Sequence, residues 1–157
     1  CCNHSSVRVI TFINFLLFLS KMDNCIFCKI LKGEIPCYKV YEDHNCFAFL
    51  DINPFVKGHV LVIPKNHYKW LWDLPDEDYI PLMKNVKLIA NKLKLAFNID
   101  WVEEVVAGIG VDHAHVHLLP RRPDDGLPEV PSKPLEPKLS KEEMEEIKEK
   151  IKNSLSN

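Results

Sequence analysis

The sequence predicts an α+β fold, in which an antiparallel sheet of about five strands carries one long helix and is followed by a C-terminal helix. Short apolar or alternating runs, each ending in turn-forming residues, stand on both sides of residues 76–98 and are typical of strands. Within residues 76–98 the apolar residues instead repeat with the period of a helix. A second helical pattern occupies the end of the chain.

The first part of the chain contains a predicted helical turn and three predicted strands. A helical turn is expected over residues 25–31, and "KGEIP" after it forms a turn. "CYKVYED" (37–43) alternates in polarity and "CFAFLDI" (46–52) is largely apolar, so both are predicted strands. "GHVLVIPK" (58–65) is the third, and Pro64 ends it.

The long helix is predicted over residues 76–98 from one apolar stripe. Pro81 is compatible with this helix if it lies in the first turn, where its missing N–H is not needed. The stripe consists of Ile80, Met83, Val86, Ala90, Leu93 and Phe97.

The second part returns to strands and ends in a helix. "WVEEVVAG" (101–108) and "VDHAHVHLLPR" (111–121) are predicted as an antiparallel pair, and a proline-rich, extended segment follows. The last helix begins at Ser140, because Ser140 and Glu143 have the spacing of a capping box. Its apolar stripe is Met144, Ile147, Ile151 and Leu155.

Composition indicates one globular domain. The chain has 157 residues, 46% of them hydrophobic and 27% charged, which is enough to bury a core without disulfides. A formal charge of -2 gives no basic patch, so nucleic-acid binding is not supported. Cys25 and Cys28 form a Cys-x-x-Cys pair, while Cys37 and Cys46 stand alone. This pattern favours reduced thiols and a metal site over a disulfide framework.

Residues 1–21 are expected to lie outside the functional domain. Their apolar run, "VRVITFINFLLFLSK", is too short and too interrupted to predict a membrane span, although it resembles the apolar part of a signal peptide. A membrane anchor, or an element packed on the fold, is the alternative. We expect residues 22–122 to form the functional domain, and residues 123–157 to add the proline-rich segment and the last helix.

Three histidines alternate with apolar residues in the 111–121 run. On a strand, His113, His115 and His117 would share one face, because successive side chains point to opposite sides. They could be packed imidazoles with hydrogen-bond partners, or ligands of a hydrolytic zinc ion. They could also perform nucleophilic catalysis at phosphorus, since a neutral imidazole is a good nucleophile near pH 7 when its other N–H is held.

The histidine run and its neighbours resemble the histidine triad (HIT) family of nucleotide hydrolases and transferases. "CIFCKILKGEIP", "VYED", "AFLDINPFVKGHVLVIPKNH" and "HAHVHLLPR" occur in the order and spacing of that family, over residues 25–121. "CIFCKI" and "PKNH" favour the Hint-like branch, including its bacterial-type members. The resemblance implies a cytoplasmic homodimer that pairs through the long helix and a neighbouring strand.

The resemblance also assigns catalytic roles to four histidines. His115 would be the nucleophile that forms a nucleotidyl-histidine intermediate, and the His113 carbonyl would accept its ring N–H. His117 would contact the phosphate and help the leaving group depart, and His59 would also line the phosphate site. No catalytic metal is required for this chemistry.

Five further residues match nucleotide-binding positions of the family. Asp51 would bind the ribose hydroxyls, since a carboxylate can accept two hydrogen bonds. Phe49 and Ile52 would enclose the base, and Gly110 and Val111 would lie beside the phosphate.

Some bacterial-type members of the family hold a structural zinc ion with two cysteines and two histidines. The matching residues in this sequence are Cys25, Cys28, His67 and His113. Two thiolates and two imidazoles would make a closed tetrahedral site.

The resemblance implies hydrolysis of a purine nucleoside phosphoramidate or a related nucleotidyl conjugate. A dinucleoside polyphosphate hydrolase, or a zinc-stabilised nucleotide-binding module with little catalysis, is the alternative. One departure favours the module: "VVAGIGVDH" is shorter than the usual loop, and Ile109 replaces an expected glutamine. Outside both sites, His44 is expected in a turn. Arg121 and Arg122 are expected at a solvated strand end, and attraction of phosphate is the alternative role for them.

Overall fold

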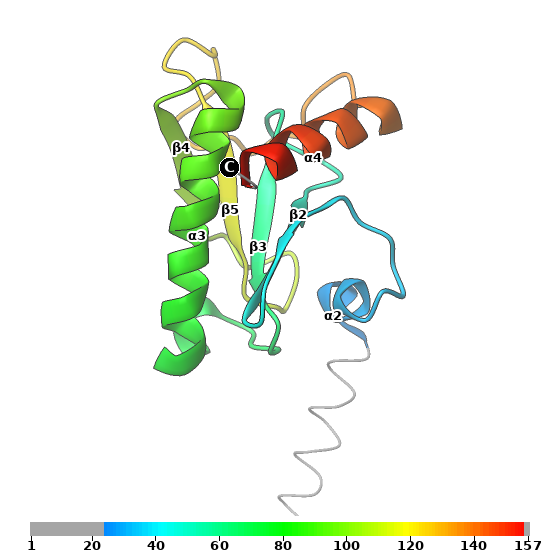
Figure 1. The fold of residues 1–157 in the computed structure, drawn as a ribbon, viewed down its shortest axis with the longest axis vertical. Helices are drawn as coiled ribbons and strands as arrows, with labels where there is room; N and C mark the ends of the chain where they lie inside the picture. The colour runs from blue at the N-terminus through cyan, green and yellow to red at the C-terminus, as the bar shows by residue number, and fades with distance from the viewer. Residues whose placement is uncertain (1–23, 156–157) are drawn as a thin grey trace, which may run out of the picture.

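The computed structural model describes residues 24–155, which form a five-stranded antiparallel sheet in the order β1-β2-β3-β5-β4 (Figure 1). The strands are β1 (Lys39–Glu42), β2 (Cys46–Leu50), β3 (Val60–Pro64), β4 (Trp101–Val105) and β5 (Val116–Arg121). The helices are α2 (Ile26–Leu31), α3 (Asp76–Phe97) and α4 (Lys141–Leu155), with a short 3-10 helix at Leu71–Asp73. This confirms the predicted α+β fold.

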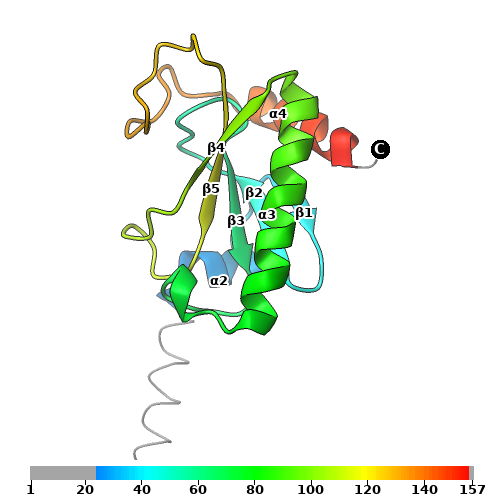
Figure 2. The ribbon, with the colours of Figure 1, turned by 90° about the vertical axis from the view of Figure 1, so that its left-hand side faces the viewer.

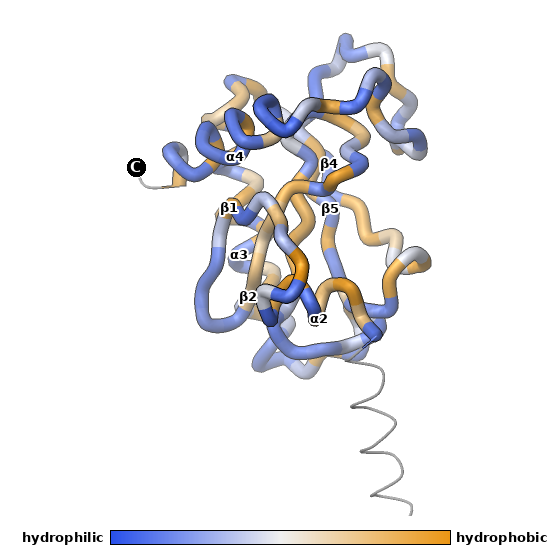
Figure 3. The backbone as a smooth tube through the Cα atoms, turned by 90° about the vertical axis from the view of Figure 1, so that its right-hand side faces the viewer, coloured by the Kyte–Doolittle hydropathy of each residue, from blue (hydrophilic) through white to orange (hydrophobic). Residues whose placement is uncertain are grey.

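Each face of the sheet has its own core. On one face, α3 lies along the strands and α4 crosses near one end of them (Figure 2). Alternate residues of the central strands, such as Ala48, Val62 and Leu118, are buried on this side. The residues between them in β2 and β3, such as Phe49 and Leu61, pack with α2 on the other face. In Figure 3 the strands contain many hydrophobic residues, whereas α4 is largely hydrophilic.

The helix termini follow local sequence signals. Ser140 and Glu143 form the predicted capping box, in which the Ser140 hydroxyl accepts the Glu143 N–H at 3.1 Å and the Glu143 carboxylate accepts the Ser140 N–H at 2.9 Å. Pro75 precedes the first residue of α3 in an extended conformation, so the helix begins at Asp76. Pro81 therefore lies beyond the first turn, where it removes one backbone donor from the helix.

The strand predicted over residues 111–121 is shorter than expected. Strand β5 begins at Val116, because the residues before it bond outside the sheet: the Ala114 N–H donates to the Tyr68 carbonyl at 2.7 Å. Likewise β4 ends at Val105. The alternation nevertheless persists, and Ala114, Val116 and Leu118 all join the core beneath α3.

Arg121 does not lie at a solvated strand end, and this prediction was wrong. Its side chain is 3% exposed and donates to the carboxylates of Glu103 and Asp125 and to the Pro128 carbonyl at 3.2 Å. A buried guanidinium needs such partners, because a charge without them is costly to bury. Arg121 therefore holds the start of the proline-rich segment against the end of β5. Arg122 is exposed and donates to the carbonyls of Phe97 and Asn98 at the end of α3.

No helix among residues 24–155 is long and apolar enough to cross a membrane. The predictions for residues 1–21 lie outside the described residues.

Candidate active site and metal centre

Two groups of side chains that could each hold a metal ion flank His115, one through His113 and the other through His117. The first, which we call the Cys/His cluster, consists of Cys25, Cys28, His67 and His113. The second, which we call the Asp/His cluster, consists of Asp51, His59 and His117. Phe27 of α2 contacts the edges of both the His113 and His115 rings, with centroids 5.8 and 5.3 Å away. The triad therefore lies on the α2 side of the sheet, as the alternation predicted.

His115 is held in one tautomer. Its Nδ1 lies 2.7 Å from the backbone carbonyl of His113. A carbonyl oxygen can only accept, so Nδ1 carries the proton and Nε2 keeps its lone pair. The ring is 6% exposed, which limits competition from water. His115 therefore has the orientation and protonation of a nucleophile.

A backbone N–H fixes the tautomers of two more histidines. The Phe55 N–H donates to His59 Nδ1 at 3.2 Å, so the proton of the neutral His59 ring is on Nε2. That Nε2–H donates to His117 Nδ1 at 2.9 Å. His117 consequently carries its proton on Nε2, and its ring centroid is 4.9 Å from that of His115. The histidine run thus presents a lone pair on His115 beside an N–H donor on His117.

Burial keeps these imidazoles neutral. Loss of solvation, together with a smaller effect of neighbouring histidines, lowers the pKa of His59 to about 4 and that of His117 to about 3. The negative charge of Asp51 raises the pKa of His59 and so offsets part of this effect. Burial also lowers the pKa of His115, whereas the hydrogen bond to the His113 carbonyl raises it by a smaller amount. At neutral pH the His115 ring is therefore neutral, which is the form that a nucleophilic imidazole requires.

Acidification should destabilise the protein through the same rings. The ordinary histidine pKa of 6.5 applies to the unfolded chain, whereas His59 and His117 titrate near 4 and 3 when folded. Between these values the unfolded state binds more protons, so the free energy of unfolding falls as the pH falls, by about 1.4 kcal/mol per pH unit for each ring. We expect urea unfolding to give a free energy about 2–4 kcal/mol lower at pH 5 than at pH 6.5. His117→Asn keeps an acceptor for His59 and should reduce the fall in the free energy of unfolding between pH 6.5 and pH 5. An equal fall in the variant and the wild type would contradict the assignment.

The Cys/His cluster has the spacing of a tetrahedral site. His113 Nδ1 lies 3.5 Å from Cys25 Sγ and 3.6 Å from Cys28 Sγ, and His67 Nδ1 lies 3.3 Å from Cys28 Sγ. Sulfur and nitrogen ligands of one tetrahedral zinc ion are separated by about 3.6 Å, given the usual bond lengths. All four residues are buried.

His113 is already oriented for a metal. Its Nε2–H donates to the Pro64 carbonyl at 3.0 Å, which leaves the Nδ1 lone pair directed at the two sulfur atoms. Metal-bound histidines usually make such a second hydrogen bond, which fixes the ring. The same residue supplies the carbonyl that holds His115, so the cluster and His115 are connected through one segment of backbone.

The predicted nucleotide-binding residues separate into two places. Asp51 lies next to the histidines, with its Oδ2 3.9 Å from His59 Nδ1, and its Oδ1 accepts the Asn53 N–H at 2.9 Å. Gly110 and Val111 instead line a cavity of about 400 Å³ beside Cys25 and His67. Their roles toward a nucleotide stay predictions.

The predicted base-binding pair differs in exposure. Phe49 is 4% exposed and packs edge-on against Phe27, with centroids 5.5 Å apart. Ile52 is 68% exposed in the turn after β2. A ligand could therefore contact Ile52 directly, whereas Phe49 is almost entirely covered.

Sequence reasoning missed Phe55 and Pro64. Both act on the histidines through backbone groups, Phe55 through its N–H and Pro64 through its carbonyl. Every residue but proline has an N–H and every residue has a carbonyl, so the residue type gives no signal for these roles. His44 lies exposed in the predicted turn and belongs to neither cluster.

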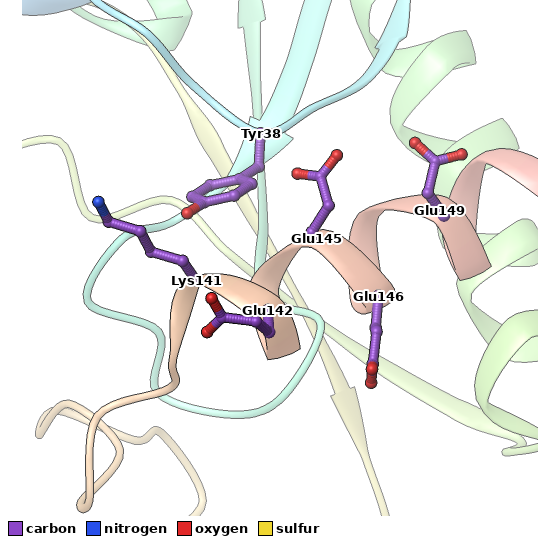
Figure 4. A pocket seen from close by; sticks show the side chains of 6 residues that line it. All are labelled: Tyr38, Lys141, Glu142, Glu145, Glu146 and Glu149. Atoms are coloured by element: carbon purple, nitrogen blue, oxygen red, sulfur yellow. The ribbon is translucent and has the colours of Figure 1, made fainter.

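A cavity of about 670 Å³ lies elsewhere, between Tyr38 and α4 (Figure 4). Its other lining residues are Lys141, Glu142, Glu145, Glu146 and Glu149. Lys148 pairs with two of these glutamates, Glu145 and Glu149, as expected of a solvated helix face. No residue of either histidine-containing cluster lines it.

Comparison with known proteins identifies relatives of this arrangement. The family model described as HIT domain matches residues 32–124. An uncharacterized HIT-like protein of Methanocaldococcus jannaschii is 47% identical over 106 residues, which are 65% of this chain and 82% of that protein. The adenosine 5'-monophosphoramidase hnt1 of Schizosaccharomyces pombe is 44% identical over 135 residues, which are 82% of this chain and 99% of that protein.

A solved structure shares the fold. The crystal structure of a Zn-bound histidine triad family protein from Mycobacterium smegmatis superposes with a TM-score of 0.73 and 30% identity, and the match covers 86% of this chain and 95% of that one. Sequence and structure comparisons therefore agree on the same group of proteins.

Proposed function

The chain belongs to the HIT domain family, and from that membership we propose that it hydrolyses purine nucleoside phosphoramidates, or related nucleotidyl conjugates, at the α-phosphorus. The observation that carries the proposal is the His115 ring, whose Nδ1–H is held by the His113 carbonyl so that Nε2 has a free lone pair. The relative named as an adenosine 5'-monophosphoramidase supports the same substrate class.

The reaction would proceed in two displacements. In the first, His115 Nε2 bonds to phosphorus, the P–N bond breaks, and the amine leaves with a proton from solvent. The positive charge that develops on the His115 ring is stabilised by the His113 carbonyl at Nδ1. In the second, water attacks phosphorus, gives its proton to solvent, and releases neutral His115 and the nucleoside monophosphate.

The neighbouring histidines would bind the phosphate during both steps. The hydrogen bond from His59 leaves His117 with an Nε2–H that can donate to a phosphate oxygen or to the leaving group. His113 contributes its carbonyl, and His59 acts by fixing the tautomer of His117. This assigns a role to each of the four predicted histidines.

The nucleoside would be bound by the residues near Asp51. We propose that the Asp51 carboxylate accepts the ribose hydroxyls, and that the base lies against Ile52 and the rim of Phe49. Gly110 and Val111 would contact the phosphate or the leaving group from the 106–112 loop. Asp51 is supported best, because it stands beside His59.

The Cys/His cluster would hold a structural zinc ion. Its donor set and its spacing fit tetrahedral zinc, and the Mycobacterium smegmatis relative is described as Zn-bound. Bound zinc would cross-link α2 to the segment before β5. Cys25 and Cys28 lie at the start of α2, whereas His113 lies next to the nucleophile.

We also propose a cytoplasmic homodimer that pairs through α3 and β4. Strand β4 is an edge of the sheet, so its outer backbone groups have no partner strand among the described residues. Trp101 of β4 is 38% exposed, which is consistent with a covered surface in a dimer.

A comparison of two substrates tests the proposed activity. We expect a higher kcat/KM for an adenosine phosphoramidate than for a dinucleoside polyphosphate. The reverse order would identify the chain as a dinucleoside polyphosphate hydrolase. Binding of AMP without turnover of either compound would identify a nucleotide-binding module, which the short 106–112 loop would explain.

A further inference from the structure

We propose that the Asp/His cluster is a second transition-metal site, and that a divalent ion such as zinc inhibits the enzyme by binding there. The inhibition rests on the proposed function, whereas the binding does not. The site uses Asp51, His59 and His117 and shares no residue with the Cys/His cluster.

The three side chains already converge. One ligand atom from each lies within 4.8 Å of the other two. Asp51 Oδ2 is 3.9 Å from His59 Nδ1, and His59 Nε2 is 2.9 Å from His117 Nδ1. These two distances involve opposite nitrogens of His59, of which one ion can bind only one. Nitrogen and oxygen ligands of one tetrahedral zinc ion are about 3.3 Å apart, so the Asp51 and His117 side chains would rotate to bring both within that distance of His59 Nδ1.

The electrostatics of the pair formed by Asp51 and His59 favour a cation. The Phe55 N–H can only donate, so His59 Nδ1 has no proton of its own in the neutral ring. A carboxylate oxygen therefore faces an unprotonated ring nitrogen at 3.9 Å, and no proton lies between them. His59 is fully buried, so solvent does little to screen these two electron-rich atoms. An ion that displaces the Phe55 N–H from Nδ1 would be attracted by both.

The donor set selects the kind of ion. Two imidazoles and one carboxylate suit zinc and related first-row ions, whereas magnesium and calcium prefer sets made of oxygen alone. His117 and Asp51 are partly exposed, which gives an ion access from solvent and leaves positions for water. Both features distinguish this cluster from the buried Cys/His cluster.

Occupancy of this site would oppose hydrolysis. A bound ion would engage Asp51, which we assign to the ribose, and would replace the hydrogen bond between His59 and His117. The ion at Nδ1, and not His59, would then position the His117 ring, so the Nε2–H would no longer be directed at the phosphate. Inhibition should therefore be competitive with AMP.

The test uses the full chain loaded with one equivalent of zinc and then titrated with more zinc, followed by calorimetry and elemental analysis. We expect a second equivalent to bind to the wild type. Asp51→Asn should weaken this second equivalent at least about tenfold, which is the effect of losing even an outer-shell partner. The asparagine oxygen can still accept the Asn53 N–H, so the turn is preserved. His117→Asn, which keeps an acceptor for His59, should have the same effect, and Asp124→Asn, at an exposed site, should have none.

Cobalt provides a second readout. Co²⁺ in the Cys/His cluster gives thiolate-to-metal charge-transfer bands, and Co²⁺ bound by Asp51, His59 and His117 adds d–d bands without them. Uptake of only one equivalent by the wild type would overturn the proposal. Binding of the second equivalent with equal affinity by all three variants would also overturn it.

The activity assay separates this inference from the proposed function. Zinc beyond one equivalent should inhibit turnover of an adenosine phosphoramidate in the wild type. Full turnover with the second equivalent bound would overturn the inhibition and leave the proposed function intact. An enzyme that binds the second equivalent but turns over no nucleotide at any zinc level would refute the proposed function and leave the metal site.

Discussion

His115→Ala should reduce kcat for an adenosine phosphoramidate by about 10⁴-fold or more, while AMP still binds. Loss of a covalent nucleophile typically has an effect of this size, since the remaining groups cannot form the intermediate. Binding should survive because Asp51 and His117 remain in place. The measurement is steady-state turnover together with AMP titration by calorimetry.

Matched variants separate nucleophilic loss from a change in folding. His44→Ala removes an exposed histidine from a turn outside both clusters, and its kcat should equal that of the wild type. His115→Gly with added imidazole should regain part of the turnover, because free imidazole can occupy the vacated space and attack phosphorus. Turnover by His115→Ala within tenfold of the wild type would mean that another group bonds to phosphorus.

Trapping the intermediate gives a direct check. A nucleotidyl group should be found on His115 after rapid acid-free quenching and mass spectrometry of the digested protein. His117→Asn should accumulate more of this species if His117 assists the second displacement as well as the first. A label found on His113 or His59 would contradict the tautomers assigned above, because His113 Nε2 donates to Pro64 and His59 Nε2 donates to His117.

The sheet and both large helices were predictable because local patterns determine them. β2 and β3 are short apolar runs between turns, and the stripes of α3 and α4 have helical spacing. Strand ends were less predictable. β5 begins at Val116 because the N–H of Ala114 donates to the carbonyl of Tyr68, a residue remote in sequence. No pattern within residues 111–121 contains that contact.

The candidate site was predictable in its residues but not in its hydrogen bonds. Alternation placed the three histidines on one side, and the family resemblance supplied Asp51, His59 and the cysteine pair. The tautomers depend on the Phe55 N–H and on the Pro64 and His113 carbonyls, which are backbone groups that almost every residue type offers. Arg121 was assigned to solvent because basic residues at strand ends are usually exposed. Its partners Glu103 and Asp125 come from two separate segments, so only the folded chain reveals the buried network.

Removal of zinc from the Cys/His cluster should cause the largest loss of stability. The protein is expected to contain one zinc ion per chain by elemental analysis, and Cys28→Ser or chelation should lower the free energy of unfolding by about 5 kcal/mol or more, since structural zinc contributes directly to folding. Cys37→Ser is the matched control, because Cys37 is half-buried but lies outside the cluster. Equal unfolding curves for Cys28→Ser and Cys37→Ser would refute a structural metal.

Zinc removal should also affect His115, because His113 contributes its ring to the Cys/His cluster and its carbonyl to His115. Its Nδ1 points at the cysteines, while its carbonyl accepts the Nδ1–H of His115 at 2.7 Å. When the His113 ring is released, the carbonyl loses its fixed position and His115 can exchange tautomers. We therefore expect kcat to fall at temperatures where the metal-free protein is still folded, and the nitrogen-15 shifts of His115 to change from one tautomer to an average of two. A metal-free protein that is less stable but keeps its kcat and its His115 shifts would limit zinc to holding α2 against the sheet.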